Sequence, residues 1–340
     1  MVMKRAGEPV RMAFLLVPQF SMMAFSAALE PLRSANRLAE RRLFEWQLVS
    51  PDGQPVAASN GISIAAHAAI AQLDRTDMLA VCGGIEPGAR GQKFHHHLRR
   101  LARHGAMIGA LSTGSFILAE AGLLANRRCT VHWEYAELFR ARYPTLRISQ
   151  DLYVVDRDVF TCSGGTAALD LMLHFIGEVS GPQLAMSVAE QFIHPLIRRQ
   201  EDQQRAQMHA RYGIASPKLA QIIRLMEGAL DEPLNVQAIA DKVAISARQV
   251  ERLFRKQLEI SPRAFYLRLR LDKARTLLRH TLSPVRSVAL ECGFNSTSHF
   301  CHAYKRVFGL APTLERQRLP EQRLPVDTAT AAGAQAGRSA

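Results

Sequence analysis

The sequence predicts an α/β domain with a mostly parallel sheet, followed by an all-α domain that contains two helix-turn-helix units. Short apolar runs alternate with helical patterns over roughly the first 180 residues, and no strand pattern follows Lys218. Most of the net positive charge lies in the part without strands. A length of 340 residues exceeds that of one typical domain, so two domains are expected.

The first domain is expected to alternate strands with helices. Apolar runs predict buried strands, and apolar residues at helical spacing predict the helices between them. The expected strands cover residues 12–17, 45–50, 77–82 and 106–111, and the expected helices cover 24–42, 94–104 and a third that begins at 116–121. Such alternation is typical of βαβ units and of a parallel sheet. A further helix is expected at 183–199, where the alternation has stopped.

Polar and small residues separate the domains and end the chain. We expect the first domain at residues 10–197, a linker at 198–216, the second domain at 217–318 and a disordered tail at 319–340. Three helices of the second domain are expected to begin at Ser-Pro pairs, at 216–217, 261–262 and 283–284. Serine accepts hydrogen bonds from free N–H groups at a helix start, and proline at the first helical position needs no such bond.

The charge distribution differs sharply between the domains. The whole chain carries a net charge of +13, yet residues 1–210 hold 22 basic and 19 acidic residues, whereas residues 211–320 hold 19 basic and 9 acidic residues. Positive charge confined to one third of a chain indicates a domain that binds a polyanion. The alternative is an ordinary soluble basic surface.

Several classes of protein do not fit the sequence. No apolar run approaches the roughly 18 residues of a membrane span, and the first ten residues lack the features of a signal peptide. Five scattered cysteines fit a reducing compartment, so we expect a cytoplasmic protein that does not bind to membranes. His95, His96 and His97 point to different faces of a helix and cannot converge on one ion. We expect neither a metal nor a cofactor.

One pattern occurs twice in the basic domain. A short amphipathic helix is followed by a turn and then by a serine-capped helix with an apolar spine and a basic end; the two copies span residues 239–256 and 288–306. Ser246 and Gln249 form a capping box in the first copy. This is a helix-turn-helix arrangement, whose second helix places its first residues in the major groove of DNA. A connecting helix at residues 263–279 would span about 25 Å and set the two units in successive grooves.

Side chains that face away from the apolar spines are the candidates for binding double-stranded DNA. Arginine can bind guanine through two hydrogen bonds, Ser, Thr and His contact base edges or phosphates, and basic residues at the helix ends bind phosphates. The candidates are Arg248, Glu251, Arg252, Arg255 and Lys256 in the first unit and Thr297, Ser298, Cys301, His302, Lys305 and Arg306 in the second. The alternative is that these charges only solvate a helical surface.

The sequence of this domain closely resembles the AraC/XylS family of DNA-binding domains. The resemblance covers about 100 residues and rests on Ala289, Gly293-Phe294, Ser298-His299-Phe300, Phe308-Gly309 and Pro312, which fall where the signature of that family falls. It implies a transcriptional regulator, expected to be a homodimeric activator that works with RNA polymerase.

A tight turn in the first domain raises the possibility of catalysis. The segment Ala110-Leu-Ser112-Thr-Gly114 follows an expected strand and opens a helix, and it differs little from the Gly-x-Ser-x-Gly elbow of serine hydrolases. His132 lies nearby in sequence, so a Ser112-dependent hydrolase or amidase fused to a DNA-binding domain is the alternative function. No acidic partner for His132 is identifiable.

Residues 12–180 resemble the PfpI-type, class I glutamine amidotransferase-like domain that occurs fused to AraC-type domains. The matching stretches are Phe20–Met22 and Glu30–Asn36, Val81–Gly84, the elbow, Thr130–Trp133 and Cys162–Asp170. The resemblance implies a flavodoxin-like parallel sheet sandwiched by helices. Enzymes of that superfamily carry cysteine where this chain has Ser112, and without an easily ionised thiol we expect no enzyme. Glu30 matches the carboxylate that faces the elbow.

A narrower resemblance concerns the ligand. Residues 132–134, 162–170 and 190–194 look most like those of the regulators of glycine betaine, carnitine and arginine catabolism. It implies a small effector with a cationic head and a carboxylate, bound by a carboxylate, by aromatic faces and by hydroxyl and amide groups. The expected pocket residues are Phe20, Glu30, Ser112, Thr113, His132, Trp133, Cys162 and Thr166. For Phe20 and Trp133 the alternative is core packing.

Overall fold

The structure is a computed structural model, and it describes residues 8–85, 94–202, 204, 216–281 and 283–317. The chain divides into two compact units, Met1–Ala215 and Ser216–Ala340. The expected start of the second domain, at residue 217, lies beside this division. The expected tail at 319–340 lies outside the described residues.

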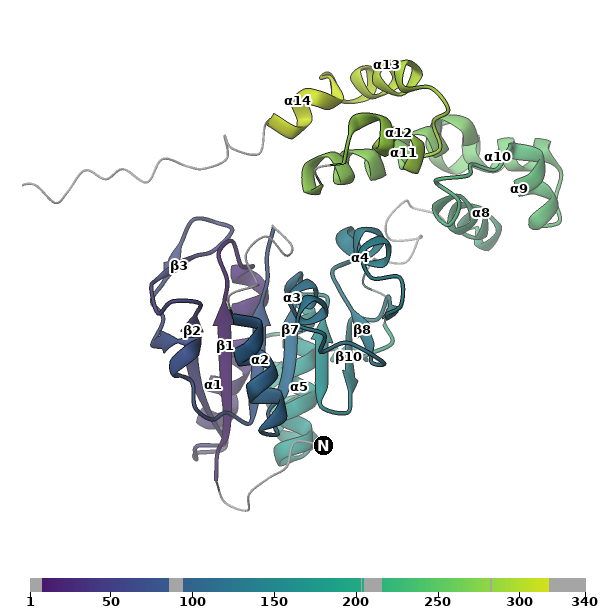
Figure 1. Cartoon of the computed structure of the whole chain (residues 1–340). Helices are drawn as coiled ribbons and strands as arrows, with labels where there is room; N and C mark the ends of the chain where they lie inside the picture. Colours follow the sequence, from purple (N-terminus) through teal and green to yellow (C-terminus); the bar gives the residue numbers. More distant parts are fainter. Residues whose placement is uncertain (1–7, 86–93, 203, 205–215, 282, 318–340) are drawn as a thin grey trace, which may run out of the picture. The chain divides into compact units, whose positions relative to one another are not determined.

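The first unit is built on a seven-stranded sheet with the strand order β10-β11-β7-β6-β1-β2-β5 (Figure 1). Every neighbouring pair is parallel except β10 and β11, which are antiparallel. The strands are β1 (Val10–Leu16), β2 (Phe44–Ser50), β5 (Ala68–Ala69), β6 (Met78–Cys82), β7 (Met107–Leu111), β10 (Tyr153–Asp156) and β11 (Val159–Cys162). Two small sheets pair β3 (Val56–Ala57) with β4 (Ser63–Ile64) and β8 (Arg128–Thr130) with β9 (Arg147–Ser149).

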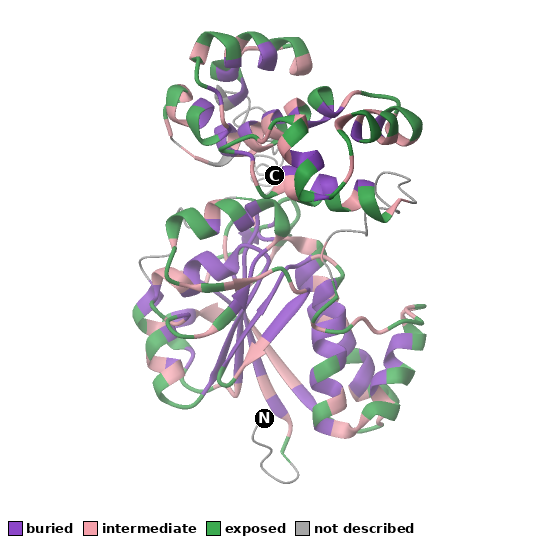
Figure 2. Ribbon diagram, turned by 90° about the vertical axis from the view of Figure 1, so that its right-hand side faces the viewer, coloured by how far each residue is buried: buried purple, intermediate pink, exposed green. Residues whose placement is uncertain are grey.

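Helices cover both faces of this sheet. One face, which includes Phe14 and Phe160, packs against α1 (Met22–Leu38), α5 (Ala167–Ser180) and α6 (Pro182–Gln191). The other face, which includes Leu15, packs against α2 (His95–Arg103), α3 (Gly114–Glu120) and α4 (Ala136–Arg142). Figure 2 shows the central strands buried along most of their length, as expected when both faces of a parallel sheet are covered. The predicted flavodoxin-like α/β fold is confirmed.

Over residues 216–281 and 283–317, which the structure describes, the second unit consists of helices and the turns between them. Its helices are α8 (Pro217–Glu227), α9 (Val236–Lys242), α10 (Ala247–Leu258), α11 (Pro262–His280), α12 (Val285–Glu291), α13 (Thr297–Phe308) and α14 (Pro312–Gln317). The pairs α9–α10 and α12–α13 are the two predicted helix-turn-helix units, and α11 connects them. Within the described ranges of both units, no helix is long and apolar enough to cross a bilayer.

Two predicted helix boundaries are wrong. The helix expected at 183–199 is α6, which ends at Gln191; Ile193 adopts a left-handed φ of 52° and Pro195 follows it closely, and neither residue suits a helix interior. The third Ser-Pro pair does not act as the other two do. Ser216 and Ser261 cap α8 and α11, but α12 begins at Val285 after Pro284, with no side-chain cap.

Candidate nucleic-acid interface and elbow site

The first helix-turn-helix unit fixes the start of its second helix through side chains. The Ser246 hydroxyl accepts a hydrogen bond from the Gln249 N–H at 3.2 Å, and the Gln249 side chain accepts one from the Ser246 N–H at 2.8 Å. The predicted capping box is therefore confirmed. Val250 and Phe254 are fully buried one turn apart. Burial of this face determines which side chains of α10 face solvent.

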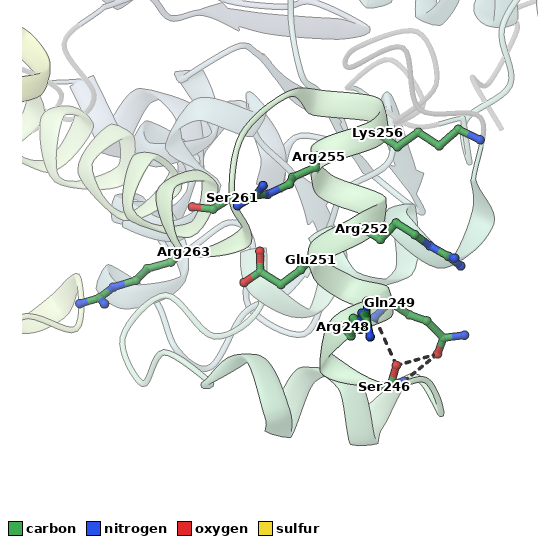
Figure 3. A pocket seen from close by; sticks show the side chains of 9 residues that line it. All are labelled: Ser246, Arg248, Gln249, Glu251, Arg252, Arg255, Lys256, Ser261 and Arg263. Atoms are coloured by element: carbon green, nitrogen blue, oxygen red, sulfur yellow. Dashed lines mark hydrogen bonds between the residues drawn. The ribbon is translucent and has the colours of Figure 1, made fainter.

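The solvent side of α10 is strongly basic and borders a hollow of about 1210 Å³. Figure 3 shows Arg252 and Lys256 leaving the helix on one side, and Glu251 and Arg255 on the other. The hollow is lined by Ser246, Arg248, Gln249, Glu251, Arg252, Arg255, Lys256, Ser261 and Arg263. All the residues predicted to contact DNA in this unit are among them.

The second unit repeats the arrangement with different chemistry. The Ser296 hydroxyl accepts a hydrogen bond from the His299 N–H at the start of α13, and Phe300 and Tyr304 are fully buried. Of the residues predicted to contact DNA, Ser298, His302, Lys305 and Arg306 are exposed, and Thr297 and Cys301 are half-buried. The first two turns of α13 thus carry no arginine or lysine, whereas α10 already presents Arg248 and Arg252 there.

The elbow of the first unit is a tight turn, as the sequence predicts. Ser112 has a left-handed φ of 59°, and its N–H donates to the Cys162 carbonyl at 2.9 Å. Its side chain is buried. Gly164 lies so close that a Cβ atom there would be 2.8 Å from the Ser112 Cβ. The surrounding backbone therefore holds Ser112 in a conformation that serine rarely adopts.

Loops from several strand ends meet around this turn. The Thr113 hydroxyl donates to the Gly84 carbonyl at 2.6 Å, and the Tyr135 hydroxyl donates to the Ile85 carbonyl at 2.9 Å. The Ser115 hydroxyl donates to the Thr130 carbonyl at 2.7 Å. The loops after β6, β8 and β11 therefore all border the start of α3, at the carboxyl ends of the strands, where α/β folds bind ligands.

His132 has the wrong geometry for the predicted alternative, a serine hydrolase. Its Nδ1 atom accepts a hydrogen bond from the Glu134 N–H at 3.3 Å, whereas the histidine of a catalytic triad donates from Nδ1 to a carboxylate. The Glu134 carboxylate lies 4.0 Å from Nδ1, which is too far for a hydrogen bond. Burial lowers the pKa of His132 and thereby favours its neutral form. The ring of Trp133 lies 5.4 Å from the His132 ring, and the residue is 44% exposed.

Two known families match the chain. The DJ-1/PfpI family matches residues 10–178, and the helix-turn-helix domain matches residues 239–318. The HTH-type transcriptional regulator CdhR of Pseudomonas aeruginosa is 46% identical over 325 residues, which make up 95% of this chain and 96% of CdhR. The chain belongs to the HTH-type transcriptional regulators that join a DJ-1/PfpI domain to an AraC-type DNA-binding domain.

Other relatives of this regulator agree with that assignment. The HTH-type transcriptional regulator GbdR of Pseudomonas aeruginosa is 42% identical, with 92% of this chain and 86% of GbdR aligned. A crystal structure of an AraC family transcriptional regulator from Pseudomonas putida is 31% identical, has a TM-score of 0.51 and covers 54% of this chain and 100% of that one. The predicted resemblance and the predicted DNA-binding function are confirmed.

Some predicted pocket residues of the regulator lie elsewhere than expected. Glu30 is not a buried carboxylate: its side chain is 42% exposed on α1 and pairs with Arg33 at 2.7 Å. Phe20 is fully buried and packs edge-on against Phe25, so its ring belongs to the core. Cys162 is also fully buried; its Sγ accepts a hydrogen bond from the Gly164 N–H, and burial raises its pKa to about 12.

Thr166, which is exposed at the start of α5, leads to a group of residues that the sequence did not reveal. Its hydroxyl accepts a hydrogen bond from the Arg198 side chain at 2.8 Å. Arg198 also donates to both oxygens of the fully buried Asp170 carboxylate, from its backbone N–H to Oδ1 and from its guanidinium to Oδ2. His194 lies 2.9 Å from the same carboxylate. An acid within the apolar run of α5 does signal a need for a partner, but the sequence does not identify that partner.

The chain continues along the edge of the sheet after this group. The Gln200 backbone and side-chain oxygens accept hydrogen bonds from the Leu152 and Val155 N–H groups at 3.0 and 3.3 Å. The Gln204 amide nitrogen lies within hydrogen-bond distance of three oxygens, one on each of Thr130, Val131 and Asp151, and its two hydrogens are shared among them. The first residues of the expected linker therefore lie against the first unit.

The second unit also contains a buried carboxylate that the sequence did not reveal. Glu315 is fully buried and accepts hydrogen bonds from Arg275, Arg279 and Tyr304 at 2.9, 2.6 and 3.0 Å. Burial works to raise the pKa of Glu315, but these hydrogen bonds outweigh it and the net shift is downward. The group ties α14 to α11 and α13, beneath the second candidate DNA-binding helix.

Proposed function

We propose that the regulator binds double-stranded DNA by placing α10 and α13 in two successive segments of the major groove. The observation that carries this proposal is the pair of capped helices, each with a buried apolar face and an exposed polar face. The charges support different roles for the two helices. Arg248 and Arg252 suit guanine edges and Lys256 suits phosphates. On α13, hydrogen bonds to base edges suit Thr297, Ser298, Cys301 and His302. Lys305 and Arg306 suit phosphates at the end of α13.

DNA binding is tested by measuring affinity against salt concentration. We expect the affinity of the full chain for duplexes selected from a random library to fall steeply with salt, because basic side chains displace condensed counterions. The variant Arg252→Ala/His302→Ala should lose about tenfold or more in affinity. The matched control is Arg157→Ala, because Arg157 is exposed in the first unit and pairs with Asp156. Equal losses in both variants would contradict the proposed interface.

We propose that the first domain binds a small effector with a cationic head and a carboxylate, such as glycine betaine, carnitine or arginine. The loops around Ser112 are the proposed site, with Thr113, His132, Trp133 and Thr166 beside it. The exposed ring of Trp133 offers a π-face to a cation, and Arg198 beside Thr166 offers positive charge to a carboxylate. The proposed site does not include Phe20 and Cys162, because both are buried in the core. It does not include Glu30 either, because that side chain pairs with Arg33 at the surface.

The effector is tested by calorimetric titration of the three compounds into the full chain. We expect at least one to bind, with an affinity about fivefold weaker in Trp133→Leu and a smaller change in Trp133→Phe, which keeps an aromatic face. The variant Trp46→Phe serves as the control, since Trp46 lies on β2. If none of the three compounds binds, the proposed effector class is wrong and the DNA-binding proposal is unaffected.

We propose further that the first domain senses its ligand without turning it over. The positions of the His132 nitrogen and of the buried cysteines support this proposal. Turnover of an amide or ester that is abolished by Ser112→Ala would contradict it.

We also propose that the protein works in the cytoplasm as a homodimeric activator that contacts RNA polymerase; the family resemblance supports these points.

A further inference from the structure

The connecting helix α11 holds the first helix-turn-helix unit through a tyrosine. The Tyr266 hydroxyl donates to the Ala229 carbonyl at 2.5 Å and accepts a hydrogen bond from the Leu234 N–H at 3.4 Å. Both partners belong to the segment that joins α8 to α9. Tyr266 itself is buried, and burial raises its pKa, so it remains a neutral hydrogen-bond donor at neutral pH. One face of α11 is thereby fixed to the segment that precedes the first unit.

One turn further along, α11 holds the second unit through an arginine. Arg270 donates to the Cys292 and Gly293 carbonyls at 2.7 and 2.6 Å, and its guanidinium lies 4.1 Å from the centre of the Phe294 ring. These carbonyls directly follow the last residue of α12, where the helix dipole favours a cation. Tyr266 and Arg270 are four residues apart, so they lie on the same side of α11.

The two segments held by α11 also touch each other. Gly293 has a left-handed φ of 73°, and a Cβ atom there would be 2.7 Å from Pro233 Cδ and 2.8 Å from the Asp231 and Leu230 carbonyl oxygens. Only glycine combines this conformation with so close an approach. The turn of the second unit therefore rests directly on the backbone that precedes the first unit.

We infer that Tyr266, Arg270 and Gly293 form a clamp that fixes the separation and orientation of α10 and α13, and so sets the spacing of the two DNA half-sites that the protein accepts. This inference rests on the proposed use of both helices to contact DNA. One inserted base pair turns a half-site by about 34° around the DNA axis and moves it by about 3.4 Å. A pair of units locked by this clamp cannot follow such a change. Units joined by α11 alone can pivot at the ends of that helix.

The test uses the full chain and duplexes that the wild-type protein selects from a random library of about 30 base pairs. Three probes are compared: the selected duplex, the same duplex with one base pair inserted between the half-sites, and a duplex with one half-site scrambled. We expect the insertion to weaken wild-type binding about tenfold or more. In Arg270→Gln and Tyr266→Phe, the penalty for the insertion should shrink to about threefold or less, while binding to the single half-site stays within about twofold of wild type.

The control is Asp272→Asn, which alters an exposed carboxylate on the same helix that pairs with Arg268. It should keep the wild-type spacing preference. Tyr266→Phe retains the aromatic ring and removes only the hydroxyl. It therefore still tests whether the clamp sets the spacing of the half-sites if Arg270→Gln fails to fold. The inference is overturned if both clamp variants keep the wild-type penalty, or if they lose affinity equally for all three probes. Selection of only one contiguous half-site also overturns it, whereas enrichment of no sequence contradicts the proposed DNA-binding function itself.

Discussion

At the scale of single residues, two buried carboxylates of this regulator are stabilised by a few specific hydrogen-bond donors. Asp170 and Glu315 both lie fully buried, and each is surrounded by cationic or hydroxyl donors from segments distant in sequence. A carboxylate in such a place is stable only while its partners remain, because an uncompensated buried charge costs several kcal/mol. Each acid therefore fastens one segment of the chain to the rest of its unit.

Replacement of Asp170 tests the first fastening point. Asp170→Asn leaves Arg198 with a neutral partner, and we expect the first unit to lose about 3 kcal/mol of unfolding free energy, with faster hydrogen exchange at residues 193–202. Urea unfolding followed by Trp fluorescence measures the first effect, because both tryptophans belong to this unit. The control is Asp158→Asn, whose carboxylate is 60% exposed in its pair with Arg127. That change should cost less than about 1 kcal/mol.

Replacement of Glu315 tests the second fastening point through pH. The folded pKa of Glu315 is lowered, so its contribution is complete above the unfolded value of about 4.3 and is lost as the pH falls through the folded value. We expect the hydrogen-exchange protection of α11, α13 and α14, corrected for intrinsic rates, to fall over this acid range. Glu315→Gln should lower the protection at neutral pH and flatten its pH dependence. The control is Asp272→Asn, which alters an exposed ion pair with Arg268. It should change neither the protection at neutral pH nor its pH dependence.

At the scale of elements, the helices that matter most for function follow directly from sequence pattern. The apolar spine of α10 and its serine cap are local features, so a single sequence is enough to predict its start and its exposed side. The surroundings of Ser112 are not local. They depend on loops after β6, β8 and β11 and on the distant Arg198, and no periodicity in the sequence brings these segments together. The position of Glu30 opposite the elbow is predicted only by the family resemblance, and in the structure its side chain is half-exposed and pairs with Arg33.

The cap of α10 gives a prediction that separates stability from DNA binding. Ser246→Ala removes the acceptor for the Gln249 N–H, and we expect a loss of about 1 kcal/mol in stability. Ser246→Asp keeps an acceptor and should keep most of the stability. Its negative charge would lie in the basic hollow beside Arg248, however, and should weaken DNA binding several-fold at low salt. If both variants bind DNA like the wild type, α10 is not part of the interface.

At the scale of the whole molecule, the two units carry separate physical tasks. Residues 1–210 are close to neutral, so we expect the basic unit to account for nearly all of the salt dependence of DNA binding. The slope of log affinity against log salt, per bound protomer, should be the same for the full chain and for residues 216–340. A full chain with a clearly steeper slope would show that the first unit also contacts phosphates.

The number of units and their fold classes could be predicted from the sequence, because hydrophobic periodicity and charge vary along the chain on the scale of a domain. The point where the first unit ends could not be predicted. Composition marks residue 198 as the start of a polar stretch, but Arg198, Gln200 and Gln204 use their polar groups to bind the first unit. We propose that the connection between the domains begins only after Gln204.

The hydrogen bonds of Gln200 have a consequence for fragments of this protein. β10 is the last strand of the sheet, and Gln200 accepts hydrogen bonds from the N–H group of Val155 on this strand and from that of Leu152 just before it. A fragment that stops at residue 197 would lose these acceptors, and an uncovered strand edge is a template for intermolecular pairing and aggregation. A fragment that extends through Gln204 keeps the hydrogen bonds of Gln200 at this edge. It should stay monodisperse in light scattering at concentrations where the shorter fragment precipitates.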